Sequence, residues 1–230
     1  MSMLKKPLAR ILIVSSFLFL LGVVALAAAG RKNGVVLSAD HRTTIATHPS
    51  GHVVAPPSND ASLTEIAGNL SKYPYGVYFC CYGETISGPD SQIGEAFWAG
   101  IPFTPSTNVT ATKISTSVGY VNGNNSVALS LNADNNGVPG AVLATADASN
   151  LGTFGDCCTL ASVGGSSKGI NLTAGTQYWV VAYTDNNSQN TWDAWAYNTT
   201  DMRDFPWAFY DNGTWEATEG ILPGYAVYGH

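Results

Sequence analysis

The chain has few charged residues: Asp, Glu, Lys and Arg make up only 11% of its 230 residues, and the formal net charge is −6. An average soluble domain has roughly 25% charged residues. The polar surface must therefore come mostly from Asn, Ser, Thr and Gly, as is common on extracellular β proteins. Nucleic acid and anionic membranes require a basic face. The sequence shows none, so neither partner is predicted.

Histidine is missing from the long central part of the chain. His41, His48 and His52 lie near the N-terminus, and His230 is the last residue. Catalytic triads and Cys-His pairs need an imidazole beside the nucleophile, and zinc and copper sites rely on histidine ligands. The sequence therefore argues against such hydrolases and metal sites, and it predicts no cofactor.

Long hydrophobic runs are also lacking, apart from one at the N-terminus. There, "MSMLKKPLAR" is basic, "ILIVSSFLFLLGVVAL" is apolar, and "ALAAAG" supplies small residues. This order is typical of a secretory signal peptide, with cleavage around Ala27 to Ala29. The alternative is an uncleaved anchor, because the run is near the length that spans a bilayer. We expect residues 1–29 to be a signal peptide, no membrane span after cleavage, and a secreted or extracytoplasmic location (periplasm, cell surface or extracellular).

The segment 30–73 is weakly patterned and rich in Pro, Gly and Ser punctuation. Such composition favours a linker or a loosely ordered arm. Within it, "ASLTEIAGNL" could form one or two helical turns, with Ser62 as the cap and Glu65 three residues later.

From residue 74 to 230 the pattern changes to short alternating runs, which indicate β-strands. In "SVALSLN", the residues Val127, Leu129 and Leu131 share one face, as in a half-buried strand. "EAFWAGIPF" places Phe97, Ala99, Ile101 and Phe103 on one side. "TQYWVVAYT" is apolar on both faces, which predicts a central strand.

Turn residues separate these runs. "ADNNGVPG", "TDNNSQN" and "YDNGTW" place Asp-Asn between apolar segments, and Asn, Asp and Gly tolerate the positive φ of tight hairpins. The predicted fold is all-β: an antiparallel two-sheet sandwich of jelly-roll type with about ten strands, preceded by the signal peptide and a short irregular arm. An up-and-down barrel is the alternative.

Roughly residues 95–230 resemble the choice-of-anchor group of bacterial exported β-sandwich domains. The resemblance lies in a strand that ends in Asp, a Gly-x-Pro-Gly turn and a "Leu-Thr-x-Gly-x-x-Tyr-Trp" strand entry. The matching residues are Asp134, Gly137, Pro139, Gly140, Leu172, Thr173, Gly175, Tyr178 and Trp179. The resemblance implies a bacterial exported β-sandwich and assigns no biochemical activity, because the role of the group is largely unassigned.

The four cysteines form two adjacent pairs, Cys80 with Cys81 and Cys157 with Cys158. In an oxidising compartment, four cysteines predict two disulfides. Zinc ligands usually have gaps of two to four residues within a pair, and a bridge between adjacent residues would be strained. We therefore expect the first pair to bond to the second, in either of two arrangements, which closes a long loop.

Aromatic residues make up 11% of the chain and become denser toward its end. Trp192 and Trp195 are three apart, so on a strand they face opposite sides. Exposed aromatic rings could stack on sugars, whereas the alternative is that they fill the core. The candidate ligand-binding residues are Trp192, Trp195, Trp207, Trp215 and Tyr210.

Acidic and amide side chains offer two further interpretations. Hard oxygen ligands in turns make structural calcium a candidate at Asp134, Asn136, Asp185 and Asn187, although the spacing does not fit the EF-hand loop. A glycosidase would need two facing carboxylates. The available acidic residues are Glu84, Glu95, Glu216 and Glu219.

These observations favour an exported, non-catalytic β-sandwich protein, a surface, matrix or carbohydrate-binding module. Its expected partners are polysaccharides or cell-envelope components. The alternatives are a carbohydrate-active enzyme that uses paired carboxylates and a purely structural component of the cell envelope.

Overall fold

The computed structural model describes residues 34–47, 63–70, 78–156 (side chains from residue 81), 160–164, 169–198 and 203–230. Within these ranges the chain forms strands and no helix. The strands are β1 (Val35–Leu37), β2 (Thr43–Ala46), β3 (Thr64–Gly68), β4 (Tyr78–Ser87), β5 (Phe97–Phe103), β6 (Val109–Thr116), β7 (Val118–Asn122), β8 (Ser126–Asp134), β9 (Pro139–Ser149), β10 (Ala161–Gly164), β11 (Ile170–Leu172), β12 (Tyr178–Tyr183), β13 (Trp192–Asn198), β14 (Phe205–Asp211), β15 (Thr214–Gly220) and β16 (Tyr225–Gly229).

An 11-stranded antiparallel sheet, here the large sheet, consists of two blocks. One block has the order β15-β14-β5-β12-β8-β9, and the other has the order β1-β2-β4-β13-β7. A single residue pair, Ser87 with Phe97, joins β4 to β5 and so connects the blocks. The strand that the sequence predicts to be central, β12, lies between β5 and β8.

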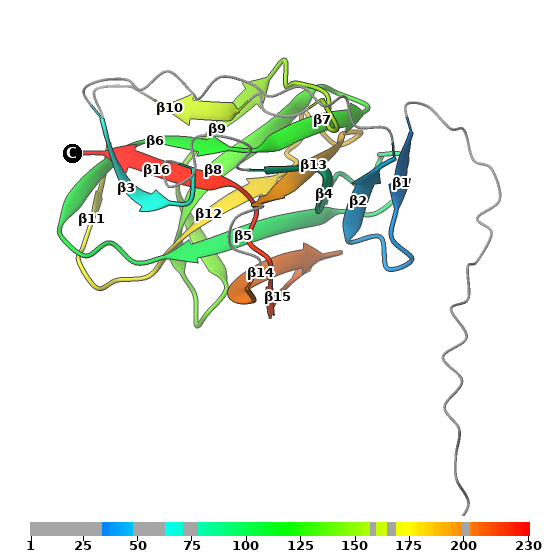
Figure 1. The fold of residues 1–230 in the computed structure, drawn as a ribbon. Coiled ribbons are helices and arrows are strands. Elements are labelled where there is room, and N and C mark those ends of the chain that lie inside the picture. Colours follow the sequence, from blue (N-terminus) through cyan, green and yellow to red (C-terminus); the bar gives the residue numbers. More distant parts are fainter. Residues whose placement is uncertain (1–33, 48–62, 71–77, 157–159, 165–168, 199–202) are drawn as a thin grey trace, which may run out of the picture. The chain divides into compact units, whose positions relative to one another are not determined.

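A small sheet of five antiparallel strands forms the second layer (Figure 1). Its order is β10-β6-β16-β3, and β11 also pairs with β6. β6 is irregular where Gly229 pairs with Ala111 and Tyr228 with Lys113, so that Thr112 is an extra residue. This bulge shifts the alternation and turns Ile114 into the core.

The main core lies between the two sheets. Ile101, Leu129 and Val180 of the large sheet are fully buried in one cluster with Val227 of the small sheet. These residues alternate along their strands with side chains on the outer face, as a sandwich requires. The alternating face predicted for Phe97, Ala99, Ile101 and Phe103 is confirmed, since all four are buried.

Two hairpin turns use the backbone conformations that the sequence predicts. Asn212 and Gly213 both have positive φ (41° and 114°) and join β14 to β15. This is the pattern of a tight two-residue hairpin, which Asn-Gly favours. At the β8–β9 turn, Asn136 and Gly137 also have positive φ.

The structure confirms the all-β sandwich and shows strands in the described parts of the segment 30–73, which are residues 34–47 and 63–70. β1 and β2 form a hairpin, and β2 pairs with β4 of the large sheet. β3 pairs with β16 of the small sheet. The helical turns expected near Ser62 and Glu65 are therefore wrong for residues 64–68, because Glu65 belongs to a strand held by a neighbouring strand rather than by local capping.

The described part of the chain contains no candidate membrane-spanning helix. None of its segments forms a helix of the length and hydrophobicity needed to cross a bilayer. The expected signal peptide at 1–29 lies outside the described residues.

Candidate ligand-binding face

Three of the five candidate ligand-binding aromatics are core residues. Trp195 is fully buried, and its indole N–H donates to the Gly224 carbonyl oxygen at 2.8 Å. Trp192 is buried on the opposite face of β13, where it donates to Thr44 Oγ1 at 3.1 Å. Trp207 is buried in the main core. The opposite orientation of Trp192 and Trp195 is confirmed, but both faces of β13 are covered, so no surface ligand can stack on these rings.

The other two candidates, Tyr210 and Trp215, lie half-buried on the outer face of the large sheet. They are cross-strand partners, and Tyr210 is also paired with Trp98 of β5. Because Ala182 is paired with Ala99, the next position brings Tyr183 of β12 beside Trp98. The four side chains form one row across four neighbouring strands. We call Trp215, Tyr210, Trp98 and Tyr183 the aromatic row.

The rings of the aromatic row contact one another. Trp98 and Tyr210 stack with centroids 3.9 Å apart and planes at 9°. Tyr183 meets Trp98 edge to face at 5.7 Å, and Trp215 meets Tyr210 in the same way at 5.6 Å. These arrangements suit the electrostatics of aromatic rings. The row is therefore a preorganised surface in which each ring fixes the next.

A small apolar cluster flanks the row on the same outer face. Trp179, Val181 and Ala208 are buried on the outer face, and Trp215 packs against them. Gly100 leaves space for this packing, because a Cβ there would lie 2.7 Å from Pro139 Cγ. The row is thus packed against a filled apolar cluster along one side.

Polar groups anchor two neighbouring rings of the row, Trp98 and Tyr183. The Trp98 indole N–H donates to Thr184 Oγ1 at 3.0 Å, and the Tyr183 and Thr145 hydroxyls are 2.8 Å apart. Beside the row, the Trp179 indole N–H donates to Asp134 Oδ1 at 2.8 Å. Burial is the largest single influence on Asp134 and raises its pKa, but the bonds from Trp179, from the Gly137 backbone and from Gln177 together hold the pKa of the carboxyl below its usual value.

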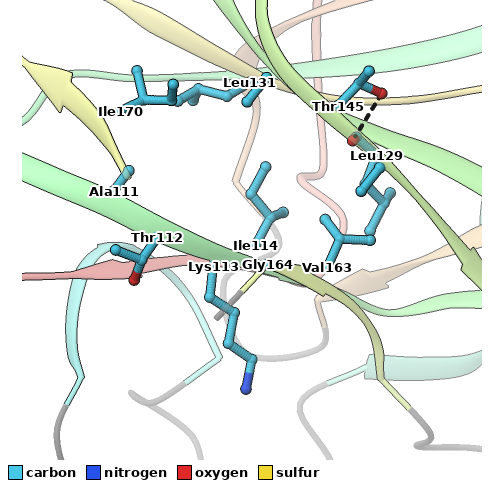
Figure 2. Close-up of a pocket in the computed structure, with 12 residues that line it drawn as sticks. Ala111, Thr112, Lys113, Ile114, Leu129, Leu131, Thr145, Val163, Gly164 and Ile170 are labelled. Carbon is cyan, nitrogen blue, oxygen red and sulfur yellow. Dashed lines mark hydrogen bonds between the residues drawn. The ribbon is translucent and has the colours of Figure 1, made fainter. Parts of the chain in front are cut away.

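A separate apolar cavity of about 210 Å³ lies between the two sheets (Figure 2). Its walls come from β6, β8, β9, β10 and β11, and two alanines of β9, Ala144 and Ala146, leave it open. In Figure 2 the Lys113 side chain extends away from the other lining residues, while the Thr145 hydroxyl donates to the Leu129 carbonyl oxygen. The cavity therefore presents few polar groups, and we assign it no ligand.

The four acidic residues considered for an enzyme lie in separate surroundings. Glu84 is buried, and its Oε1 accepts a hydrogen bond from the Tyr197 hydroxyl at 2.5 Å. Glu95 lies 3.5 Å from His41 Nδ1. Glu216 and Glu219 are exposed and, being three apart, project from opposite faces of β15. The contacts of these residues give no sign of a carboxylate pair across a groove.

Burial dominates the acidity of Glu84. It raises the pKa of this carboxyl to about 8, although the bond from Tyr197 opposes the shift. The burial of Tyr197, together with the neighbouring Glu84 carboxyl, raises the pKa of Tyr197 far above that of a free tyrosine. Glu84 is thus a neutral acid under mildly acidic conditions, and its neighbour in the sheet is Thr43 of the β1–β2 hairpin.

A second buried carboxyl, Asp193, lies on the same face of the sheet, beside Ile86. It is fully buried, and neither oxygen has a hydrogen-bond partner. Burial raises the pKa of Asp193 well above its usual value, and the backbone amide of Val121 offsets part of the rise. Val121 is the extra residue where the pairing of β13 with β7 shifts register.

The candidate calcium ligands take part in turn hydrogen bonds. Asp134 accepts bonds from the Gly137 backbone N–H, and Asp185 accepts one from the Asn187 backbone N–H at 2.8 Å. Among the described residues, no group of three His, Cys, Asp or Glu side chains is placed to hold a metal ion. Structural calcium at these turns stays a prediction.

The predicted pairing of the cysteines also stays a prediction. Cys157, Cys158 and the side chain of Cys80 lie outside the described residues. Cys81 is half-buried on β4, and no described cysteine is a free thiol.

Sequence reasoning missed two members of the aromatic row, Trp98 and Tyr183. The signal for Trp98 was present, because it alternates with the predicted core residues Phe97 and Ala99 and must face the other way. Tyr183 lacked such a signal, since its neighbours in "YWVVAY" are apolar on both faces.

Comparison with known proteins gives no assignment. The chain matches no known protein family, no curated protein and no solved structure.

Proposed function

We propose that this chain is an exported, non-catalytic β-sandwich protein, a surface or matrix module that binds carbohydrate through the aromatic row. The observation that carries the proposal is the alignment of Trp215, Tyr210, Trp98 and Tyr183 on one half-exposed face. Such a row has no role in the main core, which lies on the other side of the same strands.

The dimensions of the row fit a chain of sugar rings. Neighbouring strands lie about 4.8 Å apart, so three spacings extend the row over about 14 Å. This is comparable to the length of three linked pyranose rings. Trp98 and Tyr210 cover each other's faces where they stack, so apolar sugar faces would pack on the edges and faces of the row that point to solvent. The rings already fix one another, so little order is lost on binding.

Export and disulfide formation belong to the same proposal. They are supported by the N-terminal pattern of basic, apolar and small residues and by the paired cysteines. N-terminal sequencing of the released protein should find a start near Ala27 to Ala29. Mass mapping of non-reduced peptides should link the pair at 80 and 81 to the pair at 157 and 158, and a Cys80–Cys81 link would refute that pairing.

The binding proposal is tested by affinity electrophoresis in gels that contain soluble polysaccharides. Trp98→Ala and Tyr210→Ala should each lower retention by about tenfold or more, because each removes a large aromatic contact. Tyr82→Ala is the matched control, since Tyr82 is 42% exposed on β4 and lies outside the row. Lack of retention of the wild-type protein across neutral, cationic and anionic polysaccharides would contradict the proposal.

A further inference from the structure

The block that carries the aromatic row has an extreme charge composition. Its six strands, β5, β8, β9, β12, β14 and β15, contain no Lys, Arg or His. Their charged residues are all acidic. Any ligand on this face therefore meets negative charge alone from these strands.

Three carboxylates lie on the same outer face as the row. Asp147 of β9 is paired with Ala128 of β8, which is paired with Tyr183, so Asp147 continues the line of the row. Asp134 lies at the end of β8, where it accepts the bond from Trp179. Glu219 lies on the same face of β15 as Trp215, four residues further along, and is exposed.

The described Arg and Lys side chains lie over other rings. The Arg42 guanidinium lies 3.8 Å from the centroid of Phe209, which belongs to the main core. Arg203 lies over Phe205, on the same side of β14 as Phe209, and Lys113 lies over Tyr228 of the small sheet. No described basic side chain therefore neutralises the aromatic face.

We propose that the ligand of the aromatic row is a cationic polysaccharide, a polymer of amino sugars with free ammonium groups. The proposal rests on the carbohydrate binding proposed above and adds the class of sugar. Aromatic rings attract ammonium groups through their negative faces. Asp147, Asp134 and Glu219 add a favourable field, which would repel an anionic polysaccharide.

Two oligosaccharides that differ only in charge provide the test. A β-1,4-glucosamine hexamer and its fully N-acetylated counterpart share one backbone, and a hexauronate serves as the anionic probe. By calorimetry at a pH where the amines are charged, the glucosamine hexamer should bind about tenfold tighter than the acetylated one. Its affinity should fall with added salt, because exposed charges are screened.

A variant of the row's acidic end sharpens the test. Asp147→Asn should weaken glucosamine binding by about two- to fivefold, the range of an exposed charge pair, and leave binding of the acetylated hexamer unchanged. Asp90→Asn, an exposed carboxylate in the loop after β4, is the matched control and should leave both affinities unchanged.

The outcomes separate this inference from the function on which it rests. Equal or tighter binding of the acetylated hexamer or the hexauronate would overturn the preference for cationic sugars and leave carbohydrate binding standing. An equal effect of Asp90→Asn and Asp147→Asn would also overturn it. Absence of binding to all three probes would overturn both proposals.

Discussion

The aromatic face and the inner face of β4 and β13 belong to the same large sheet, yet their carboxyl groups have opposite surroundings. On the aromatic face, Asp134 is exposed and accepts several hydrogen bonds, which lower its pKa. On the inner face, Glu84 and Asp193 are buried, and burial raises the pKa of both. Between mildly acidic and neutral pH, Asp134 on the aromatic face is therefore charged, whereas Glu84 and Asp193 on the inner face stay protonated.

The difference shows that burial and the number of hydrogen-bond donors, more than residue type, set the pKa of a carboxyl group here. Glu84 has one hydroxyl donor, and Asp193 has only the nearby backbone amide of Val121, which makes no well-formed hydrogen bond to it. A buried carboxylate without partners is costly, so both groups favour the protonated form. Four predictions test this comparison.

The largest expected effect is on stability as a function of pH. The unfolded chain releases the Glu84 proton near pH 4.5, whereas the folded chain keeps it until about pH 8. The contribution of Glu84 to stability is therefore greatest below pH 4.5 and is lost as the pH rises to about 8, by up to about 5 kcal/mol. Urea unfolding across this range measures it. Glu84→Gln should make the fall with pH shallower, and Asp193 should supply the part that remains. An unchanged slope in this variant would contradict the raised pKa of Glu84.

The second prediction concerns Asp193, the buried carboxyl on the inner face of β13. Asp193→Leu replaces a buried carboxyl by an apolar side chain of similar size. It should raise the free energy of unfolding at pH 8 by about 1–3 kcal/mol, because removal of an unsatisfied buried group is favourable. Asp90→Leu, at an exposed site, should change stability little. Destabilisation by Asp193→Leu at pH 8 would count against a buried, unpartnered carboxyl.

Tyr210 tests whether the aromatic face serves binding more than folding. Tyr210→Ala removes a half-exposed ring that stacks on Trp98, so it should lower the free energy of unfolding by only about 1 kcal/mol. Ile101→Ala, in the fully buried layer on the other side of β5, should cost about 2–5 kcal/mol. Thermal unfolding of both variants measures the two losses of stability. Equal losses of unfolding free energy would show that the aromatic row serves folding as much as the core does.

The smallest effect concerns Asp134. Asp134→Asn weakens the bonds from Trp179 and Gln177, and because the carboxylate is exposed the expected loss is below about 1 kcal/mol. Since the folded-state pKa of Asp134 is lowered, this contribution is present at neutral pH and disappears as the pH falls through the folded-state pKa. Urea unfolding at neutral pH and in acid should show the difference only at neutral pH.

The sequence predicts the features of this protein that depend on local alternation and turn chemistry. The sandwich, the alternating core face of β5 and the Asn212-Gly213 hairpin follow from neighbouring residues. The aromatic row does not, because it needs the spatial order β15-β14-β5-β12, which joins distant segments. The prediction that Trp192 or Trp195 binds a ligand at the surface was wrong because burial also depends on distant segments. β13 lies between β4 and β7, and both of its faces are covered.

The most direct test of carbohydrate binding by the aromatic row is an NMR titration that follows the six tryptophan indole N–H signals with the glucosamine hexamer. The account predicts that the signals of Trp98 and Trp215 shift, while those of the buried Trp192, Trp195 and Trp207 stay in place. A titration in which the buried indoles shift and those of the row do not would contradict it.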